Sequence, residues 1–224
     1  MYIVLTTRCN MTCQHCCFAA TNRGVDMDIT TFRKALKIAA DNDDYITLGG
    51  GEPTLHPRFE QFLIEAIGAF DDEDAKVNVI TNGKLVRKAM LIAKLTKANV
   101  ISGELSQDPW HEEIDDKVVE TFEEIGAKNF NSRPYIRDVS KNGVIPVGRA
   151  KTLPLHEFRM ERKRTCACED LFVTPKGIIR QCGCPRSPVV GNVNDPWVWG
   201  LGLSATCYRS EEYKKHVAEL KIGA

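Results

Sequence analysis

The chain has 224 residues, of which 43% are hydrophobic, and its 30 lysines and arginines balance its 30 aspartates and glutamates. This is enough apolar material for one sizeable core with a small appendage. The balanced charge argues against a general attraction to nucleic acid or to an anionic membrane. Residues 1–7 lack the basic leader and apolar length of a signal peptide, and no run approaches the length of a membrane span. We therefore expect a cytoplasmic protein with neither a membrane partner nor a specific nucleic-acid partner.

Segments typical of β-strands alternate with segments of helical periodicity along the first 150 residues. The expected strands are Tyr2–Thr6, Tyr45–Leu48, Val77–Ile80, Val100–Ser106, Asn129–Tyr135 and Val144–Val147. The expected helices are one that Asp28 caps and that carries Phe32, Leu36 and Ala39 on one face, one marked by Phe59, Phe62, Leu63 and Ile67, and two over Val86–Leu95 and Val118–Ile125.

This alternation predicts parallel βα units, because a parallel crossover needs a connection of helical length. About six units fit before residue 150, which favours a partial, open (β/α)6 barrel over residues 1–150, and a doubly wound open sheet is the alternative. From about Lys151 the composition shifts to cysteine, proline, glycine and arginine. Residues 151–224 are therefore expected to form a small cysteine-rich extension.

The nine cysteines fall into two groups, which indicates two separate tasks. Without an export signal, reduced thiolates that hold a metal or cluster are a better interpretation than disulfides. The first group is Cys9, Cys13, Cys16 and Cys17, and the other five cysteines lie between Cys166 and Cys207.

The first group lies directly after the first expected strand. Cys9, Cys13 and Cys16 could hold three corners of a [4Fe–4S] cluster and leave the fourth iron open to a substrate or cofactor. A structural zinc site would need four ligands. Cys17 is adjacent to Cys16 and is expected to point into the core instead. The alternative is a set of structural cysteines without a metal.

The run from Thr7 to Cys16 resembles the CxxxCxxC signature of the radical SAM superfamily, where SAM is S-adenosylmethionine. The resemblance implies that the open iron binds the amino and carboxylate groups of SAM. One electron then breaks the S–C5′ bond and gives methionine and a 5′-deoxyadenosyl radical. The resemblance also implies that His15, the residue before the third cysteine, lies near the adenine.

Four further motifs resemble those of the family at the expected intervals, and together the resemblance covers residues 2–150. Gly50, Gly51 and Glu52 resemble the GGEP motif, which grips the SAM amino group. Thr81 and Asn82 match a frequent TNG, for which a plain turn is the alternative. Ser106 and Asp108 resemble an SxD that reaches the methionine or ribose, with a helix cap by Asp108 as the alternative. Arg149 lies in a GRA segment and is implied to pair with the SAM carboxylate, unless it is a surface arginine.

The second group of cysteines could form a zinc ribbon or bind a second iron–sulphur cluster. The spacing of Cys166, Gly177 and Cys182, with Gly191–Val193 after them, resembles the SPASM and twitch extensions of radical SAM enzymes. The full SPASM series is missing, so a shortened twitch-like module with one auxiliary cluster is favoured. The candidate ligands, one more than a cluster needs, are Cys166, Cys168, Cys182, Cys184 and Cys207.

The sequence thus predicts an oxygen-sensitive radical SAM enzyme that abstracts hydrogen from a peptide or from a small metabolite such as a nucleoside or sugar. Activation of a partner enzyme through a glycyl radical is a third possibility. An electron donor such as flavodoxin or ferredoxin is implied. Trp110 and His111 are candidates for substrate contact, with packing as the alternative for Trp110 and a surface position as the alternative for His111. The alternative from another class is a non-catalytic metal-binding or electron-transfer protein.

Overall fold

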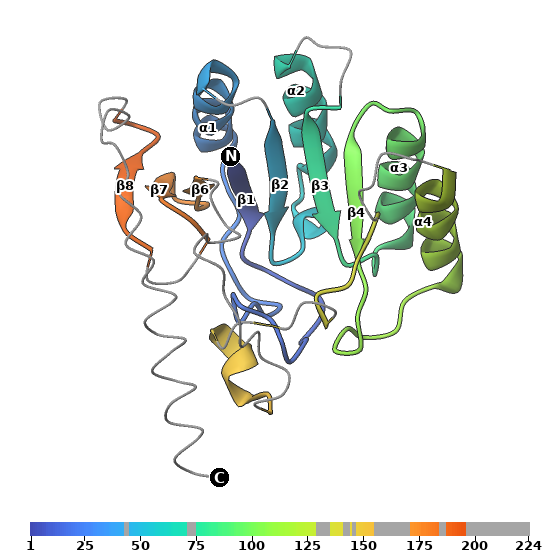
Figure 1. Ribbon diagram of the computed structural model, residues 1–224. Coiled ribbons are helices and arrows are strands. Elements are labelled where there is room, and N and C mark those ends of the chain that lie inside the picture. Colours follow the sequence, from blue (N-terminus) through green and yellow to red (C-terminus); the bar gives the residue numbers. More distant parts are fainter. Residues whose placement is uncertain are drawn as a thin grey trace, which may run out of the picture.

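The computed structural model describes residues 1–42, 45–70, 75–128, 135–140, 144, 147–154, 171–183 and 187–195. These residues form an α/β fold around an eight-stranded sheet with the order β5-β4-β3-β2-β1-β6-β7-β8 (Figure 1). The predicted α/β class with a parallel sheet is confirmed. Within the described residues, no helix combines the length and the apolar character that crossing a membrane would require.

Strands β1–β6 run parallel to one another, whereas β7 pairs antiparallel with both β6 and β8. The strands are β1 (Tyr2–Thr6), β2 (Ile46–Gly50), β3 (Val77–Thr81), β4 (Ser102–Ser106), β5 (Ile136–Arg137), β6 (Phe172–Val173), β7 (Ile178–Arg180) and β8 (Val189–Asn192). The first five follow one another in sequence order across the sheet, whereas β6 pairs with the opposite edge of β1. Carboxyl ends of β1–β5 therefore meet at one edge of the sheet.

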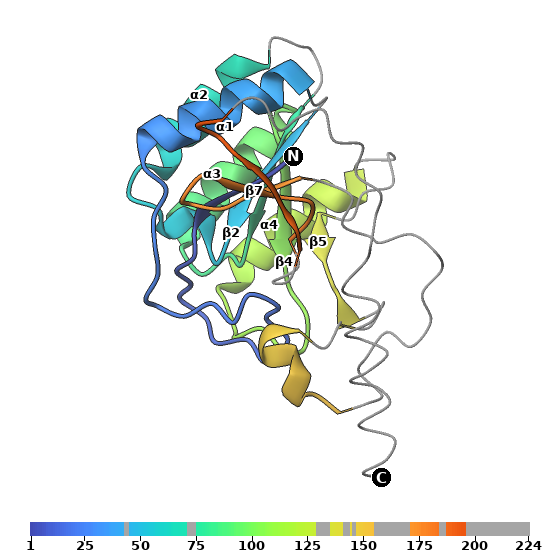
Figure 2. The same ribbon diagram turned by 90° about the vertical axis from the view of Figure 1, so that its left-hand side faces the viewer.

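Helices connect the first five strands. They are α1 (Ile29–Asn42), α2 (Phe59–Ala69), α3 (Val86–Lys97) and α4 (Asp116–Lys128), with short 3₁₀ turns η1 (Pro53–Leu55) and η3 (Gly148–Thr152). Right-handed crossovers between consecutive neighbouring strands place such helices on the same face of the sheet. Figure 2 shows α1 and α2 beside each other, with β7 in front of the central strands.

The core lies between this helical layer and the sheet. Asp28 accepts a hydrogen bond from the Thr31 amide at 2.9 Å before α1, as the capping prediction requires. The rings of Phe32 in α1 and Phe62 in α2 are fully buried and stack with centroids 4.2 Å apart. The predicted apolar faces of both helices are confirmed, and their burial fixes the loops that follow the strands.

Two expected strands differ from the structure. The fifth was predicted over Asn129–Tyr135, but residues 129–134 lie outside the described residues, Tyr135 is a bend, and β5 is Ile136–Arg137. The sixth strand was predicted over Val144–Val147, but Val144 forms only an isolated bridge and Val147 is a bend. The sheet instead continues beyond residue 150 through β6, whose two residues are too few to give a recognisable period.

Candidate functional site

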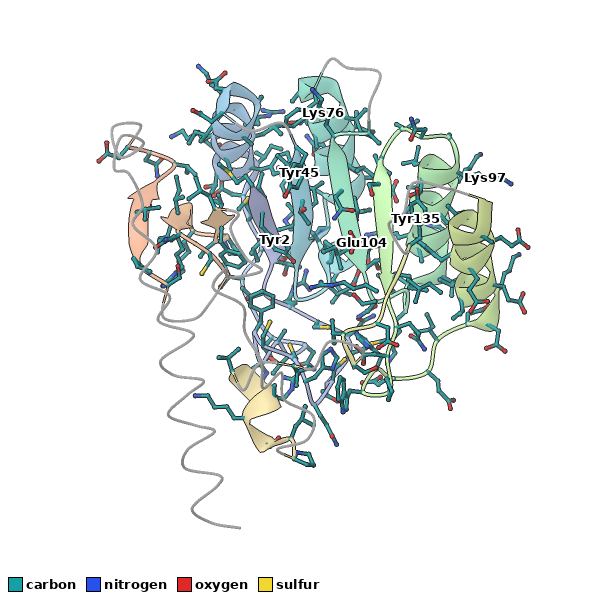
Figure 3. All side chains as sticks on the ribbon, in the orientation of Figure 1. Tyr2, Tyr45, Lys76, Lys97, Glu104 and Tyr135 are labelled. Atoms are coloured by element: carbon teal, nitrogen blue, oxygen red, sulfur yellow. The ribbon has the colours of Figure 1, made fainter. Side chains whose placement is uncertain are left out.

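A pocket lies at the carboxyl ends of the parallel strands, where loops from β1 to β5 converge. Loops that follow parallel strands usually carry the binding residues of α/β proteins. Figure 3 shows side chains gathered below these strand ends. The lining includes the side chains or backbone of Tyr2, Cys9, Cys13, His15, Cys16, Cys17, Phe18, Gly50, Gly51, Glu52, Thr81, Asn82, Ser106, Asp108, His111 and Arg137. All the cluster ligands and SAM-binding residues that were predicted within residues 2–150, except Arg149, thus lie at this one pocket.

The three predicted ligands of the catalytic cluster are free thiols on the loop after β1. Cys9 and Cys13 are each only 9% exposed, and Cys16 is half-buried. Burial raises the pKa of the Cys13 thiol to about 11 and also raises the pKa of Cys9. Thiolates at these positions therefore require a nearby positive charge, and a metal supplies one while displacing the protons. Three soft donors on one loop beside an open pocket suit a [4Fe–4S] cluster with one free iron.

The glycine segment after β2 lies directly against the cysteine loop. The amides of Gly51 and Glu52 donate to the carbonyls of Thr6 and Arg8, at 2.9 and 2.7 Å. A Cβ on Gly51 would lie 2.2 Å from the Arg8 carbonyl oxygen, so this position needs glycine. The segment thus brings its backbone to the pocket wall beside the cysteines.

The Glu52 carboxylate is buried and accepts four hydrogen bonds from described residues. One oxygen accepts from the Thr54 amide and hydroxyl and from the Thr81 hydroxyl, and the other accepts from the Asn82 amide at 2.7 Å. Burial raises the pKa of Glu52, and these donors oppose that effect. Glu52 therefore joins the loop after β2 to the loop after β3.

The TNG turn after β3 contacts the cysteine loop and is more than a plain turn. The Asn82 side-chain amide donates to Asn10 Oδ1 at 2.9 Å and lies 3.6 Å from Cys9 Sγ. Asn82 Oδ1 in turn accepts from the Lys84 amide. The Asn82 amide is thus held in place from both sides, with one donor directed at a candidate metal ligand.

A second cluster of polar side chains lies at the end of β4. Asp108 Oδ1 is 2.9 Å from His111 Nδ1, and Asp108 Oδ2 is 3.5 Å from His15 Nε2. The His15 ring packs against Trp110 and His111, with centroids 5.2 and 4.8 Å away. Asp108 Oδ1 also accepts from the Trp110 amide at 3.0 Å, and α4 starts only at Asp116. Asp108 therefore does not cap that helix.

Burial and mutual contacts shift the pKa values of the ionisable groups in this cluster. Burial lowers the pKa of His15 to about 4, so the ring is neutral at pH 7. Burial opposes ionisation of Asp108, but the contacts with His111 and His15 lower the pKa of Asp108 overall. His15 Nδ1 and Asp108 Oδ2 are buried without a hydrogen-bond partner among the described residues. Buried polar atoms of this kind usually indicate a group that binds there.

Arg149 lies on the far side of the cysteine loop, in η3. Its Nε donates to the Cys13 carbonyl at 2.9 Å and its Nη1 to the Ala20 carbonyl at 2.6 Å. The side chain is half-buried and holds the backbone of the cysteine loop, which the interpretation as a surface arginine does not explain.

Cys182 is the one candidate auxiliary ligand within the described residues, and Cys166, Cys168, Cys184 and Cys207 lie outside them. Cys182 is half-buried, and its amide donates to Ser187 Oγ at 2.9 Å. A Cβ on the neighbouring Gly183 would lie 3.2 Å from the Phe172 ring and 3.9 Å from the Phe18 ring. Cys182 thus directly precedes a glycine that lies near Phe18 of the cysteine loop.

Sequence reasoning missed several residues of the pocket, among them Tyr2 and Arg137. The Tyr2 hydroxyl accepts from the Gly50 amide at 3.2 Å, and its ring stacks on Phe172. Strand alternation places Tyr2 on the same face as Thr6, which was a usable signal. Arg137 ends β5, whose position was predicted too early in the chain.

Comparisons with known proteins agree with this geometry. The model of the radical SAM superfamily matches residues 3–133, more than half of the chain. The antilisterial bacteriocin subtilosin biosynthesis protein AlbA of Bacillus subtilis (strain 168) is 33% identical over 115 residues. That match covers 50% of this chain and 25% of AlbA, so the chain spans about a quarter of the length of this relative.

Two solved structures share the fold. BtrN in complex with AdoMet (SAM) and 2-DOIA superposes with a TM-score of 0.59 at 14% identity, over 99% of this chain and 87% of BtrN. Native anSMEcpe with bound AdoMet and the Cp18Cys peptide superposes with a TM-score of 0.54 at 14% identity, over 96% and 82% of the two chains. The family model, the cysteine loop and the shared fold lead to one conclusion: the chain belongs to the radical SAM superfamily, whose members use a [4Fe–4S] cluster and SAM for radical chemistry.

Proposed function

We propose that this chain cleaves SAM reductively and passes the resulting radical to a substrate. The observation that carries the proposal is the set of three free thiols, Cys9, Cys13 and Cys16, in a pocket that four further motif loops complete or support. When bound there, a [4Fe–4S] cluster supplies the electron that breaks the S–C5′ bond, and the 5′-deoxyadenosyl radical takes a hydrogen atom from the substrate.

The residues of this chain bind SAM and keep it in one orientation. The backbone and side chains of Gly50–Glu52 would receive the amino group, and Thr81, Asn82, Ser106 and Asp108 would surround the methionine and ribose. His15 Nδ1, which is buried without a hydrogen-bond partner among the described residues, would offer a hydrogen-bonding position beside the adenine. Arg149 would remain close to the carboxylate end through the cysteine loop. Such fixed groups contribute by holding the reacting carbon beside one substrate C–H bond.

The substrate class that we propose is a peptide or a small metabolite. The name of AlbA refers to bacteriocin biosynthesis, anSMEcpe was solved with a peptide, and BtrN was solved with 2-DOIA. We further propose that residues 151–224 form a twitch-like extension, in which four of Cys166, Cys168, Cys182, Cys184 and Cys207 hold an auxiliary iron–sulphur cluster. A flavodoxin or ferredoxin would supply the electron.

The first experiment is anaerobic. The chain is reconstituted with iron and sulphide, reduced with dithionite, and incubated with SAM, and 5′-deoxyadenosine is quantified by chromatography. We expect 5′-deoxyadenosine from the wild type and none from the Cys9/Cys13/Cys16 triple alanine variant. The matched control is Cys17→Ala, which removes a thiol from the same loop and should retain the product.

The same experiment separates the non-catalytic alternatives. A protein that isolates with zinc and without visible absorption would be a zinc-stabilised binding module. A protein that carries a reducible iron–sulphur cluster but gives no 5′-deoxyadenosine, with or without candidate substrates, would be an electron carrier and would contradict the proposal.

A further inference from the structure

Arg149 contacts the cysteine loop through three separate groups, although more than a hundred residues separate them in the chain. The guanidinium donates to the carbonyls of Cys13 and Ala20 at 2.9 and 2.6 Å. The backbone amide of Arg149 donates to the Cys16 carbonyl at 3.0 Å. Figures 1 and 2 both show the 3₁₀ turn of residues 148–152, in gold, beside the dark-blue loop. Three carbonyls within residues 13–20 are thereby fixed by one residue.

The neighbouring glycine permits this approach. Gly148 has φ +61°, and a Cβ there would lie 2.3 Å from the Cys17 carbonyl oxygen and 2.5 Å from the Cys16 carbonyl oxygen. A side chain at this position would push the turn away from the loop. Val147 and Ala150, on either side, are buried and anchor the turn.

The loop itself has few internal restraints of this kind. It contains no helix or strand between residues 9 and 20, and its internal backbone hydrogen bonds run from the Cys16 amide to the Cys13 carbonyl and from the Ala19 amide to the Cys16 carbonyl, both at 3.2 Å. A planar guanidinium with a fixed fork can hold two carbonyls at a set separation, whereas a lysine ammonium acts as a single point charge. The fork therefore determines where the chain between Cys13 and Ala20 runs, and hence where the Cys16 thiol is presented.

We propose that Arg149 is a positioning residue that holds the cysteine loop in its metal-binding shape before any metal arrives. This role is distinct from pairing with the SAM carboxylate. The identity of the metal group rests on the proposed function, but the effect of Arg149 on the loop does not.

The test compares Arg149→Met and Arg149→Lys with the wild type, and Lys151→Met is the matched control because it removes a charge from an exposed position of the same turn. The first readout is amide hydrogen exchange in the metal-free protein. Both Arg149 variants should show exchange about tenfold faster in peptides covering residues 9–20, with β2 and β3 peptides unchanged. The control should match the wild type.

The second readout is the rate at which the reconstituted protein loses iron to a ferrous chelator. Both Arg149 variants should release iron about tenfold faster, because an unrestrained loop opens more often. If Arg149→Met fails to fold, the lysine variant carries the test. If Arg149→Lys shows the same hydrogen exchange in residues 9–20 and the same rate of iron release as the wild type, the proposal is overturned. A positive charge alone would then be enough to hold the loop.

Two further outcomes are decisive. Unchanged loop exchange and iron release together with weakened SAM binding in Arg149→Met would make Arg149 a SAM ligand and overturn the positioning role. A wild type that gives no 5′-deoxyadenosine would contradict the proposed function, yet faster loop exchange in the metal-free variants would still support the role of Arg149.

Discussion

Asn82 connects the buried Glu52 carboxylate to the cysteine loop. Its backbone amide donates to Glu52, and its side-chain amide lies 3.6 Å from Cys9 Sγ. A donor directed at a thiolate ligand favours the more negative, reduced state of an iron–sulphur cluster. The TNG turn therefore contacts both the glycine segment after β2 and the cysteine loop, and under the proposed function it would lie beside the cluster as well as beside SAM.

Asn82→Leu, which keeps the shape but removes the donor, should lower the reduction potential of the reconstituted cluster. The expected change is about 20–60 mV, the one-electron equivalent of a net hydrogen bond of roughly 0.5–1.5 kcal/mol. The measurement is a redox titration followed by electron paramagnetic resonance. Asn42→Leu, at an exposed position of α1, is the control. Equal potentials at equal iron content would show that the amide does not influence the ligand.

Site residues that belong to short local motifs can be predicted from the sequence. The spacing of Cys9, Cys13 and Cys16 and the resemblance of Gly50–Glu52 to the GGEP motif identify these residues, and the structure places them at one pocket. The partners of Arg149 are not predictable in this way, because the contact joins residues 136 positions apart. Tyr2 was missed for a related reason, since its hydroxyl reaches Gly50 only once β1 and β2 pair.

Among the elements, the turn after β2 depends most on the absence of a side chain. Gly51 lies where a Cβ would meet the carbonyl oxygens of Arg8 and Thr7 at 2.2 and 3.0 Å. Backbone atoms cannot move aside as a flexible side chain can, so a substitution must separate the two loops. Gly68, at the end of α2, has nothing within 4 Å of such a Cβ.

Gly51→Ala should therefore lower the free energy of unfolding by about 2 kcal/mol. The added methyl group would break the backbone hydrogen bonds from the amides of Gly51 and Glu52 to the carbonyls of Thr6 and Arg8. Gly68→Ala should raise it by about 0.5–1 kcal/mol, because alanine favours a helix. Urea denaturation of the metal-free protein under anaerobic conditions measures both. A Gly51→Ala variant as stable as the wild type would mean that the two loops separate without cost.

Periodicity predicts elements well where they are long. Helices α1–α4 and strands β1–β4 were found with small shifts, such as the loss of Val100 and Ile101 from the start of β4. Strands β5 and β6 have two residues each, and such lengths carry no period. Their positions are set by pairing with β4 and β1, which local sequence does not contain.

Strand β1 joins the first part of the described chain to its last part, because it pairs with β2 on one side and with β6 on the other. The Phe172 ring of β6 stacks on Tyr2 of β1 and on Phe18 of the cysteine loop, with centroids 5.3 and 5.7 Å apart. The Tyr2 amide donates to the Leu171 carbonyl at 2.7 Å. Residues 171–173 thus belong to the same sheet and the same aromatic cluster as the pocket wall.

Phe172→Ala should destabilise the entire sheet by about 3 kcal/mol, the lower end for a buried phenylalanine. Hydrogen exchange should accelerate in β1 and β2 as well as in β6. Val189→Ala, at a 59% exposed position of β8, is the control and should change little. Protection of β1 at the wild-type level would mean that the first 150 residues are stable without β6.

The position of β1 between β2 and β6 has a consequence for how the protein is made. During translation β1 emerges first, but its second neighbour is about 170 residues away and appears roughly 10 to 30 seconds later at ordinary elongation rates. Until then one edge of a central, apolar strand is unpaired and open to association with other chains. The cysteine loop likewise lacks its hydrogen bonds to Arg149 until residue 149 has been synthesised. That edge of β1 therefore stays unpaired in the nascent chain until the residues of β6 have been synthesised.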